Sequence, residues 1–124
     1  MSKFVKVQTQ LRELNLIKRS LDDLKLNYEE DAVYRHIYSG RQEAVPLLVR
    51  QGGLKFGLRA ENDGPYEVVG DDMALRAIKQ TMQRVQQRYA YHKVRVETEK
   101  AGFDLVEESV GQDQVIRLTV RRWS

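Results

Sequence analysis

The chain has 124 residues, 41% of them hydrophobic and 31% charged, a balance typical of one globular domain spanning residues 1–124. It has no cysteine, which excludes disulfides and cysteine-based metal sites, and no stretch approaches the ~20 apolar residues of a membrane-spanning helix. The formal net charge of +3 weakly favours an anionic partner, and without a signal-peptide pattern we expect a soluble cytoplasmic protein.

The first half of the chain predicts one short helix among several strands. Alternating apolar residues predict a strand over Phe4–Leu11, and repeats of three and four residues predict an amphipathic helix over Leu14–Leu24. Leu26–Tyr38 predicts two strands joined by a turn near Glu30 and Asp31. Further strands are expected at Val45–Val49, Leu54–Leu58 and Tyr66–Val69, and Pro46 favours an edge or entry position for the strand that contains it.

The longest predicted element is a helix from Asp71 to Gly102. Asp71 or Asp72 can cap its start, and Gly102 can end it in a left-handed conformation. Its apolar or ring-bearing residues recur at alternating intervals of three and four, which keeps one helix face towards a core. These residues are Leu75, Ile78, Met82, Val85, Tyr89, His92 and Val96.

The C-terminal segment predicts a hairpin of two strands, Phe103–Val110 and Val115–Trp123, around a turn at residues 111–113. The whole order is strand, helix, four or five strands, helix, two strands. The economical solution is an α+β fold in which one antiparallel sheet carries both helices on one face.

The charge of the long helix is its most distinctive property. From Met73 to Val96 it carries six basic residues and no acidic one. Four residues fall within about 60° of one another on the helical wheel, in a position that we place well away from the apolar face. We call them the basic stripe: Arg84, Arg88, Tyr91 and Arg95.

The basic stripe is the predicted binding surface. We expect no acidic residue at i, i+4 spacing to pair with its arginines. Guanidinium groups beside a tyrosine can bind carboxylates or phosphates through paired hydrogen bonds. Arg121 and Arg122 extend the surface from the final strand in this hypothesis. The alternative is a solvated helix face whose arginine stems cover apolar surface.

The sequence contains few residues that would support an enzymatic function. Only His36 and His92 can act as bases near neutral pH, and neither has a recognisable serine or cysteine nucleophile nearby. No metal-ligand spacing or phosphate-binding glycine loop is present, so we expect no cofactor, no metal and no enzyme. Tyr89, His92 and Trp123 are secondary binding candidates, and ordinary packing is the favoured interpretation for His92 and Trp123.

Three segments resemble a known family. They are the run Gln87-Arg88-Tyr89-Ala90-Tyr91-His92, the Gly102-Phe103 helix exit, and the ending from Ile116 to Ser124. They are similar to the hypothetical chloroplast reading frame thirty-five family of cyanobacteria and algal plastids, a domain-of-unknown-function family. The sequence departs from the family pattern at Lys3, often His there, and at residues 72–74, where members often carry Trp.

The resemblance implies a soluble factor of photosynthetic cells, in the cytoplasm or plastid stroma, that supports photosystem biogenesis. It brings no established activity, cofactor or catalytic residue. Two functional classes therefore follow: a non-catalytic assembly factor that docks an acidic protein through the basic helix, or a nucleic-acid-binding module that uses the same helix. A small-ligand binder stays open as a third class.

Overall fold

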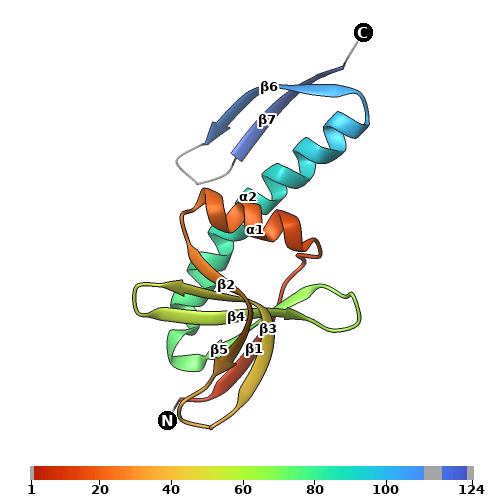
Figure 1. The fold of residues 1–124 in the computed structure, drawn as a ribbon. Helices are drawn as coiled ribbons and strands as arrows, with labels where there is room; N and C mark the ends of the chain where they lie inside the picture. The colour runs from red at the N-terminus through yellow and green to blue at the C-terminus, as the bar shows by residue number, and fades with distance from the viewer. Residues whose placement is uncertain (1, 111–115, 123–124) are drawn as a thin grey trace.

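The computed structural model describes residues 2–110 and 116–122, and it confirms the predicted α+β class (Figure 1). The predicted turn at residues 111–113 and Trp123 lie outside the described residues. In chain order the elements are β1 (Phe4–Gln8), α1 (Leu14–Asp23), β2 (Asn27–Arg35), β3 (Gln42–Gln51), β4 (Leu54–Ala60), β5 (Tyr66–Asp71), the 3₁₀ turn η1 (Asp72–Ala74), α2 (Leu75–Lys100), β6 (Phe103–Val110) and β7 (Ile116–Arg122).

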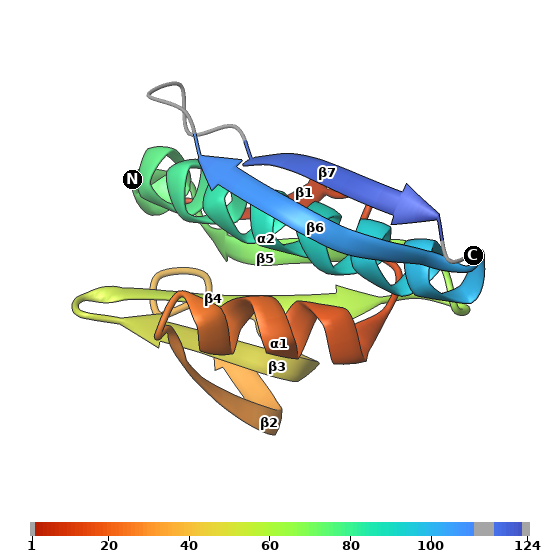
Figure 2. The same ribbon diagram turned by 90° about the horizontal axis from the view of Figure 1, so that it is seen from above.

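Five strands form one antiparallel sheet in the order β1-β5-β4-β3-β2. The last two strands differ from the single-sheet expectation, because within the described residues β6 and β7 form a separate two-stranded sheet. This hairpin contacts α2 and lies beside its C-terminal part (Figure 1). Figure 2 shows it on the side of α2 away from β3 and β4, so α2 is covered from two sides.

The main core lies between the sheet and the two helices, as the apolar repeats predict. Of the residues expected on the buried face of α2, Leu75 and Val96 are only half-buried, because they lie near the helix ends. The buried cluster consists of Leu11, Leu16, Ile17, Leu21, Leu26, Leu47, Val49, Phe56, Leu58, Val68, Ile78, Met82, Val85 and Tyr89. A smaller cluster of Tyr34, Val45, Leu48 and Val69 covers the opposite face of the sheet.

The predicted turn near Asp31 is wrong, because Asn27–Arg35 is one continuous strand. Asp31 has φ 51°, and the register with β3 passes from Glu30–Leu47 to Ala32–Val45 around it. A left-handed residue bends a strand without ending its pairing. Pro46 stands within β3, just beyond the stretch of that strand that pairs with β4, so its missing N–H interrupts no bond to β4.

Gly102 ends the long helix as predicted, whereas Asp71 caps η1, and α2 itself begins at Leu75 after Ala74, which makes no side-chain capping bond. The Asp71 carboxylate accepts a hydrogen bond from the backbone N–H of Met73 at 2.8 Å, and Gly102 has φ 83°. Gly70 lets α2 approach β5 closely, because a Cβ at this position would stand 2.7 Å from Cδ1 of Ile78. The sheet and the first turn of α2 are therefore fixed tightly to each other.

Candidate functional site

The basic stripe is not the open surface that the helical wheel predicts. Tyr91 is only 8% exposed, although it lies far from the core face of α2. Its ring lies 4.4 Å from Cζ of Arg88 and 5.1 Å from the ring of His92. The expectation of an exposed Tyr91 is therefore wrong, because its ring packs against Arg88 and His92 of the same helix.

Arg88 and His92 meet one carboxylate of α1. The Arg88 guanidinium donates from Nε and Nη2 to Oδ2 of Asp23, at 3.2 and 3.0 Å. Nε2 of His92 lies 2.5 Å from the same oxygen, and the His92 side chain is only 6% exposed. These contacts join α1 to α2, so Arg88 and His92 contribute to the helix–helix interface.

The Asp23 carboxyl is held in its charged form by these partners. Burial opposes its ionisation and would by itself raise its pKa. Hydrogen bonds from His92 and Arg88, with their charges, outweigh burial and lower the pKa of Asp23 below the ordinary aspartate value. Sequence reasoning missed Asp23 because it is 65 and 69 residues away from its partners.

Arg95 also differs from the prediction, since it does have an acid one turn further along the helix. Nε of Arg95 lies 3.4 Å from Oε1 of Glu99, at i, i+4 spacing, although both side chains are more than half exposed. Lys93 pairs in the same way with Glu97 and also with Glu13 of α1, at 3.0 Å. Both i, i+4 spacings, Lys93 to Glu97 and Arg95 to Glu99, are visible in the sequence itself.

Tyr89 has a structural role at the start of α1. Its hydroxyl oxygen accepts hydrogen bonds from the backbone N–H groups of Arg12 and Glu13, at 3.2 and 3.1 Å. The side chain of Glu13, the N-cap residue of α1, makes no capping bond of its own. A residue of α2 therefore replaces the missing local cap.

The remaining predicted site residues lie near the C-terminus. Arg121 and Arg122 belong to β7, where their backbones pair with Asp104 and Phe103. Trp123 lies outside the described residues.

The open basic surface of α2 lies on its N-terminal half. Arg76, Lys79 and Arg84 are exposed there, and within the described chain no acid lies within ion-pair distance of them. Arg76 and Lys79 line a shallow hollow of ≈ 360 Å³ together with Leu75, Gln80 and Gln83. We call Arg76, Lys79 and Arg84 the outer basic face; only Arg84 belongs to the predicted stripe.

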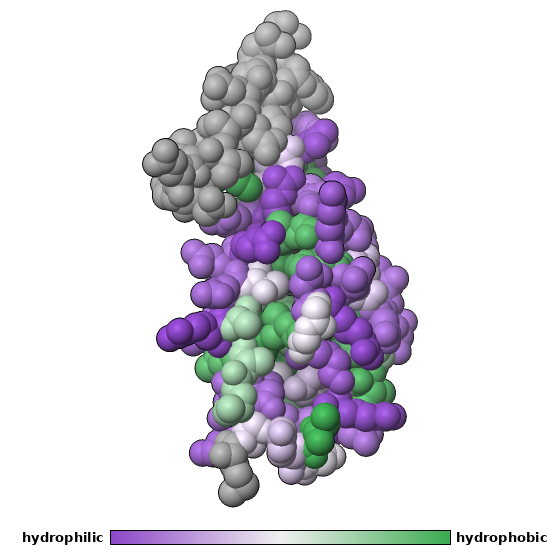
Figure 3. Space-filling view, turned by 90° about the vertical axis from the view of Figure 1, so that its left-hand side faces the viewer, coloured by the Kyte–Doolittle hydropathy of each residue, from purple (hydrophilic) through white to green (hydrophobic). Residues whose placement is uncertain are grey.

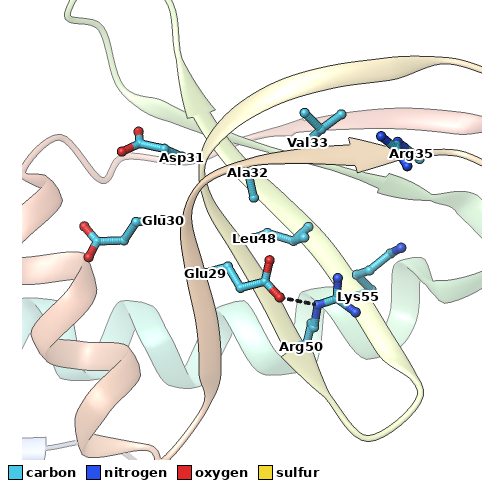
Figure 4. A pocket seen from close by; sticks show the side chains of 9 residues that line it. All are labelled: Glu29, Glu30, Asp31, Ala32, Val33, Arg35, Leu48, Arg50 and Lys55. Atoms are coloured by element: carbon cyan, nitrogen blue, oxygen red, sulfur yellow. Dashed lines mark ion pairs between the residues drawn. The ribbon is translucent and has the colours of Figure 1, made fainter.

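A second hollow, of ≈ 390 Å³, lies along β2 (Figure 4). Glu29, Arg50 and Lys55 surround Leu48, whereas Glu30 and Asp31 point away from it. The Glu29 carboxylate is 3.2 Å from Nε of Arg50. Three acidic and three basic residues line the hollow, so it shows no concentrated charge of one sign.

His36 has a nearby serine, contrary to the expectation from sequence. Its Nδ1 lies 2.7 Å from Oγ of Ser39, and its Nε2 lies 3.1 Å from Oδ2 of Asp71. The backbone N–H of Ser39 also donates to Nδ1, so the ring proton is on Nε2 and faces Asp71. The backbone N–H of Arg41 donates to Oγ of Ser39, so these contacts lock the turn after β2.

No group of three or more potential metal ligands is present among the described residues. In the same part of the chain, no helix is both long and apolar enough to cross a membrane. On the face drawn in Figure 3, hydrophilic side chains predominate and surround smaller apolar groups.

Comparison with known proteins places residues 20–119 in a family model described as protein of unknown function (DUF1257). An uncharacterised protein ycf35 of Pyropia yezoensis is 31% identical over the whole of this chain and 99% of its own length. Proteins of the same name from Guillardia theta and Cyanophora paradoxa are 28% and 27% identical, each over 99% of this chain and 98% of its own. No solved structure matches the chain.

Proposed function

The chain belongs to the DUF1257 family of proteins of unknown function, and we propose that it is a non-catalytic accessory factor that docks an acidic protein surface through the outer basic face of α2. The single observation that carries this proposal is the exposure of Arg76, Lys79 and Arg84 on a helix without an acid between Met73 and Val96. Exposed charges of one sign steer association and attract a surface of opposite sign.

The chemistry of the partner follows from the side chains on this face. Arginine binds carboxylates with two parallel hydrogen bonds, and lysine adds a mobile point charge. The neighbouring Gln80 and Gln83 can hydrogen-bond to a polar rim. An acidic protein surface supplies carboxylates at the required density, whereas the net charge of +3 is low for a nucleic-acid-binding protein.

The proposed setting is the plastid stroma or the cytoplasm of a photosynthetic cell, and the proposed task is assembly of the photosynthetic apparatus. Relatives from algal plastids support the setting. The non-catalytic part of the proposal is supported by His36 and His92, because the described contacts engage both rings with Asp71 and Asp23 in structural roles.

Affinity capture from a cyanobacterial extract at moderate salt, with and without nuclease, tests the proposal. The double variant Lys79→Glu/Arg84→Glu should lose at least about tenfold in capture of the partner, because like charges across an interface repel. The matched control is Arg19→Glu/Lys25→Glu, which changes the net charge by the same amount. Arg19 lies in α1 and Lys25 follows this helix, and both residues are exposed.

If both double variants lose capture equally, the loss is due to net charge, and this result would contradict the proposal. If nuclease treatment abolishes capture, the partner is a nucleic acid and the proposed acidic protein partner is wrong. Thermal midpoints close to that of the wild type would show that both variants are folded.

A further inference from the structure

Three large apolar side chains stand in solvent at one end of the molecule. Ile37 is 85% exposed, Met73 79% and Tyr38 77%, far more than Val94 at 41% and Val33 at 43%, the next most exposed large apolar residues among those whose side chains are described. Ile37 and Tyr38 lie in the β2–β3 loop, at the lower end of Figure 1 and opposite the β6–β7 hairpin. Met73 lies in η1, just before α2.

One carboxylate holds the two segments together. Oδ2 of Asp71 contacts Nε2 of His36, the residue immediately before Ile37, at 3.1 Å. Oδ1 of Asp71 accepts from the backbone N–H of Met73 at 2.8 Å. Asp71 thus holds the β2–β3 loop beside η1 through a contact with His36, 35 positions away in sequence, and we call Ile37, Tyr38 and Met73 the apolar tip.

The loop that carries the tip is held in a fixed shape. Backbone bonds join the N–H of His36 to the carbonyl of Arg41 and the N–H of Gly40 to the carbonyl of His36, both at 2.9 Å. Ser39 bonds to the buried ring of His36, and Gly40 adopts φ 73°. Ile37 and Tyr38 are thus carried by an ordered turn, so binding does not have to order the loop backbone.

Exposed cations flank the tip, and each nearby carboxylate has a hydrogen-bond or ion-pair partner. Arg35 and Arg41 flank the loop in sequence, Lys3 pairs with Asp72 through its backbone, and all three residues are exposed. Asp72 accepts a hydrogen bond from the backbone N–H of Lys3 at 2.7 Å. Burial opposes ionisation of Asp71, but hydrogen bonds, that of the Met73 N–H foremost, lower its pKa. Glu43 pairs with Arg59 at 3.0 Å and with Arg41 at 3.3 Å.

We propose that the apolar tip of Ile37, Tyr38 and Met73 inserts into the interface of an anionic lipid membrane, with Lys3, Arg35 and Arg41 contacting the headgroups. Aliphatic and aromatic side chains partition into the boundary between headgroups and acyl chains, and flanking cations are attracted to anionic lipids. An exposed apolar tip flanked by exposed cations fits this surface. The proposal is independent of the acidic protein partner proposed for the outer basic face.

Sedimentation of the purified full chain with vesicles tests the proposal. Vesicles of phosphatidylcholine alone are compared with vesicles of phosphatidylcholine and phosphatidylglycerol. We expect the wild type to bind the phosphatidylglycerol vesicles, and Ile37→Ser/Tyr38→Ser to lower partitioning by about tenfold. The single variant Ile37→Ser, which keeps the Tyr38 ring beside His36, should show a smaller loss in the same direction.

The control variant Val33→Ser/Val94→Ser removes two less exposed apolar side chains away from the tip and should bind as the wild type does. Wild-type protein that stays in the supernatant with both vesicle types would overturn the proposal. Tip variants that keep the wild-type thermal midpoint and bind the vesicles as well as the wild type would also overturn it. The same holds if Lys79→Glu/Arg84→Glu loses vesicle binding and the tip variants do not. Because no protein partner is present, this test can fail or succeed independently of the capture experiment.

Discussion

At the residue scale, the tertiary partners of the basic side chains decide which of them are available for binding. Arg88 shares Asp23 with His92, and Arg95 has Glu99, whereas Arg84 is exposed without an ion-pair partner among the described residues. Residues of one chemical type on one helix thus have three different environments. Substitutions at these positions should separate folding from binding.

Charge reversal at Arg88 should destabilise the fold, and the same change at Arg84 should not. Arg88→Glu places a second carboxylate against Asp23 and removes the cation over the Tyr91 ring. We expect a loss of about 1–2 kcal/mol, since both partners are only partly shielded from water. Urea unfolding of Arg88→Glu, with Arg84→Glu as the matched control, measures the difference. Equal stability of the two variants would contradict the role assigned to Asp23.

The hydroxyl of Tyr89 should stabilise the start of α1. Tyr89→Phe keeps the buried ring but leaves the N–H groups of Arg12 and Glu13 without their acceptor. The expected loss is about 1–2 kcal/mol, comparable to the loss of a helix cap. Hydrogen exchange should speed up most at these two amides. Unchanged exchange there would show that solvent satisfies them equally well.

At the element scale, α2 shows both the strength and the limit of a helical wheel. The wheel identifies the face that carries Ile78 and Val85, which are 1% and 0% exposed. It also places Tyr91 outside that face, yet Tyr91 is only 8% exposed and packs against Arg88 and His92. Periodicity identifies one buried face of a helix, but it does not report a second contact.

A charge in the middle of the core face of α2 should unfold the protein. Val85→Asp buries a carboxylate among apolar side chains, at a cost of several kcal/mol against a typical domain stability of about 5–15 kcal/mol. The same change at Val94, which is 41% exposed on the same helix, should be tolerated. Circular dichroism melts of both variants test this, and a Val85→Asp midpoint equal to that of the wild type would refute the described packing.

At the scale of the whole molecule, two aspartates link separate parts of the fold. Asp23 joins α1 to α2, and Asp71 joins the β2–β3 loop to η1. Both have a pKa below the ordinary aspartate value, because their hydrogen-bond donors outweigh the opposing effect of burial. Their charged forms are therefore favoured in the folded state relative to the unfolded state.

Acid should weaken the fold through these two residues. A lowered folded pKa contributes stability above the unfolded pKa of about 3.9, and this contribution is lost as pH falls through the folded pKa. The unfolding free energy should therefore decline with acid below about pH 5. Asp23→Asn and Asp71→Asn should each flatten this decline in urea titrations at several pH values. An unchanged slope in both variants would exclude these residues as its source.

The sequence by itself determined the features that depend on consecutive residues. Intervals of three and four residues specified α2 and its core face, and Gly102 marked its C-terminal end. The alternation of short apolar segments with two helical ones also determined the α+β class. Each of these signals arises from local backbone geometry, so it can be read without knowing what packs against the segment.

Only the tertiary structure decided which charged and apolar side chains are free. The contacts of Asp23 with Arg88 and His92 span 65 and 69 residues. The apolar tip joins Ile37 to Met73 through His36 and Asp71, which are 35 residues apart. Such contacts depend on how the elements pack, because side chains separated by long stretches of chain meet only after the sheet and helices have been placed together. The sequence carries no local pattern for this arrangement.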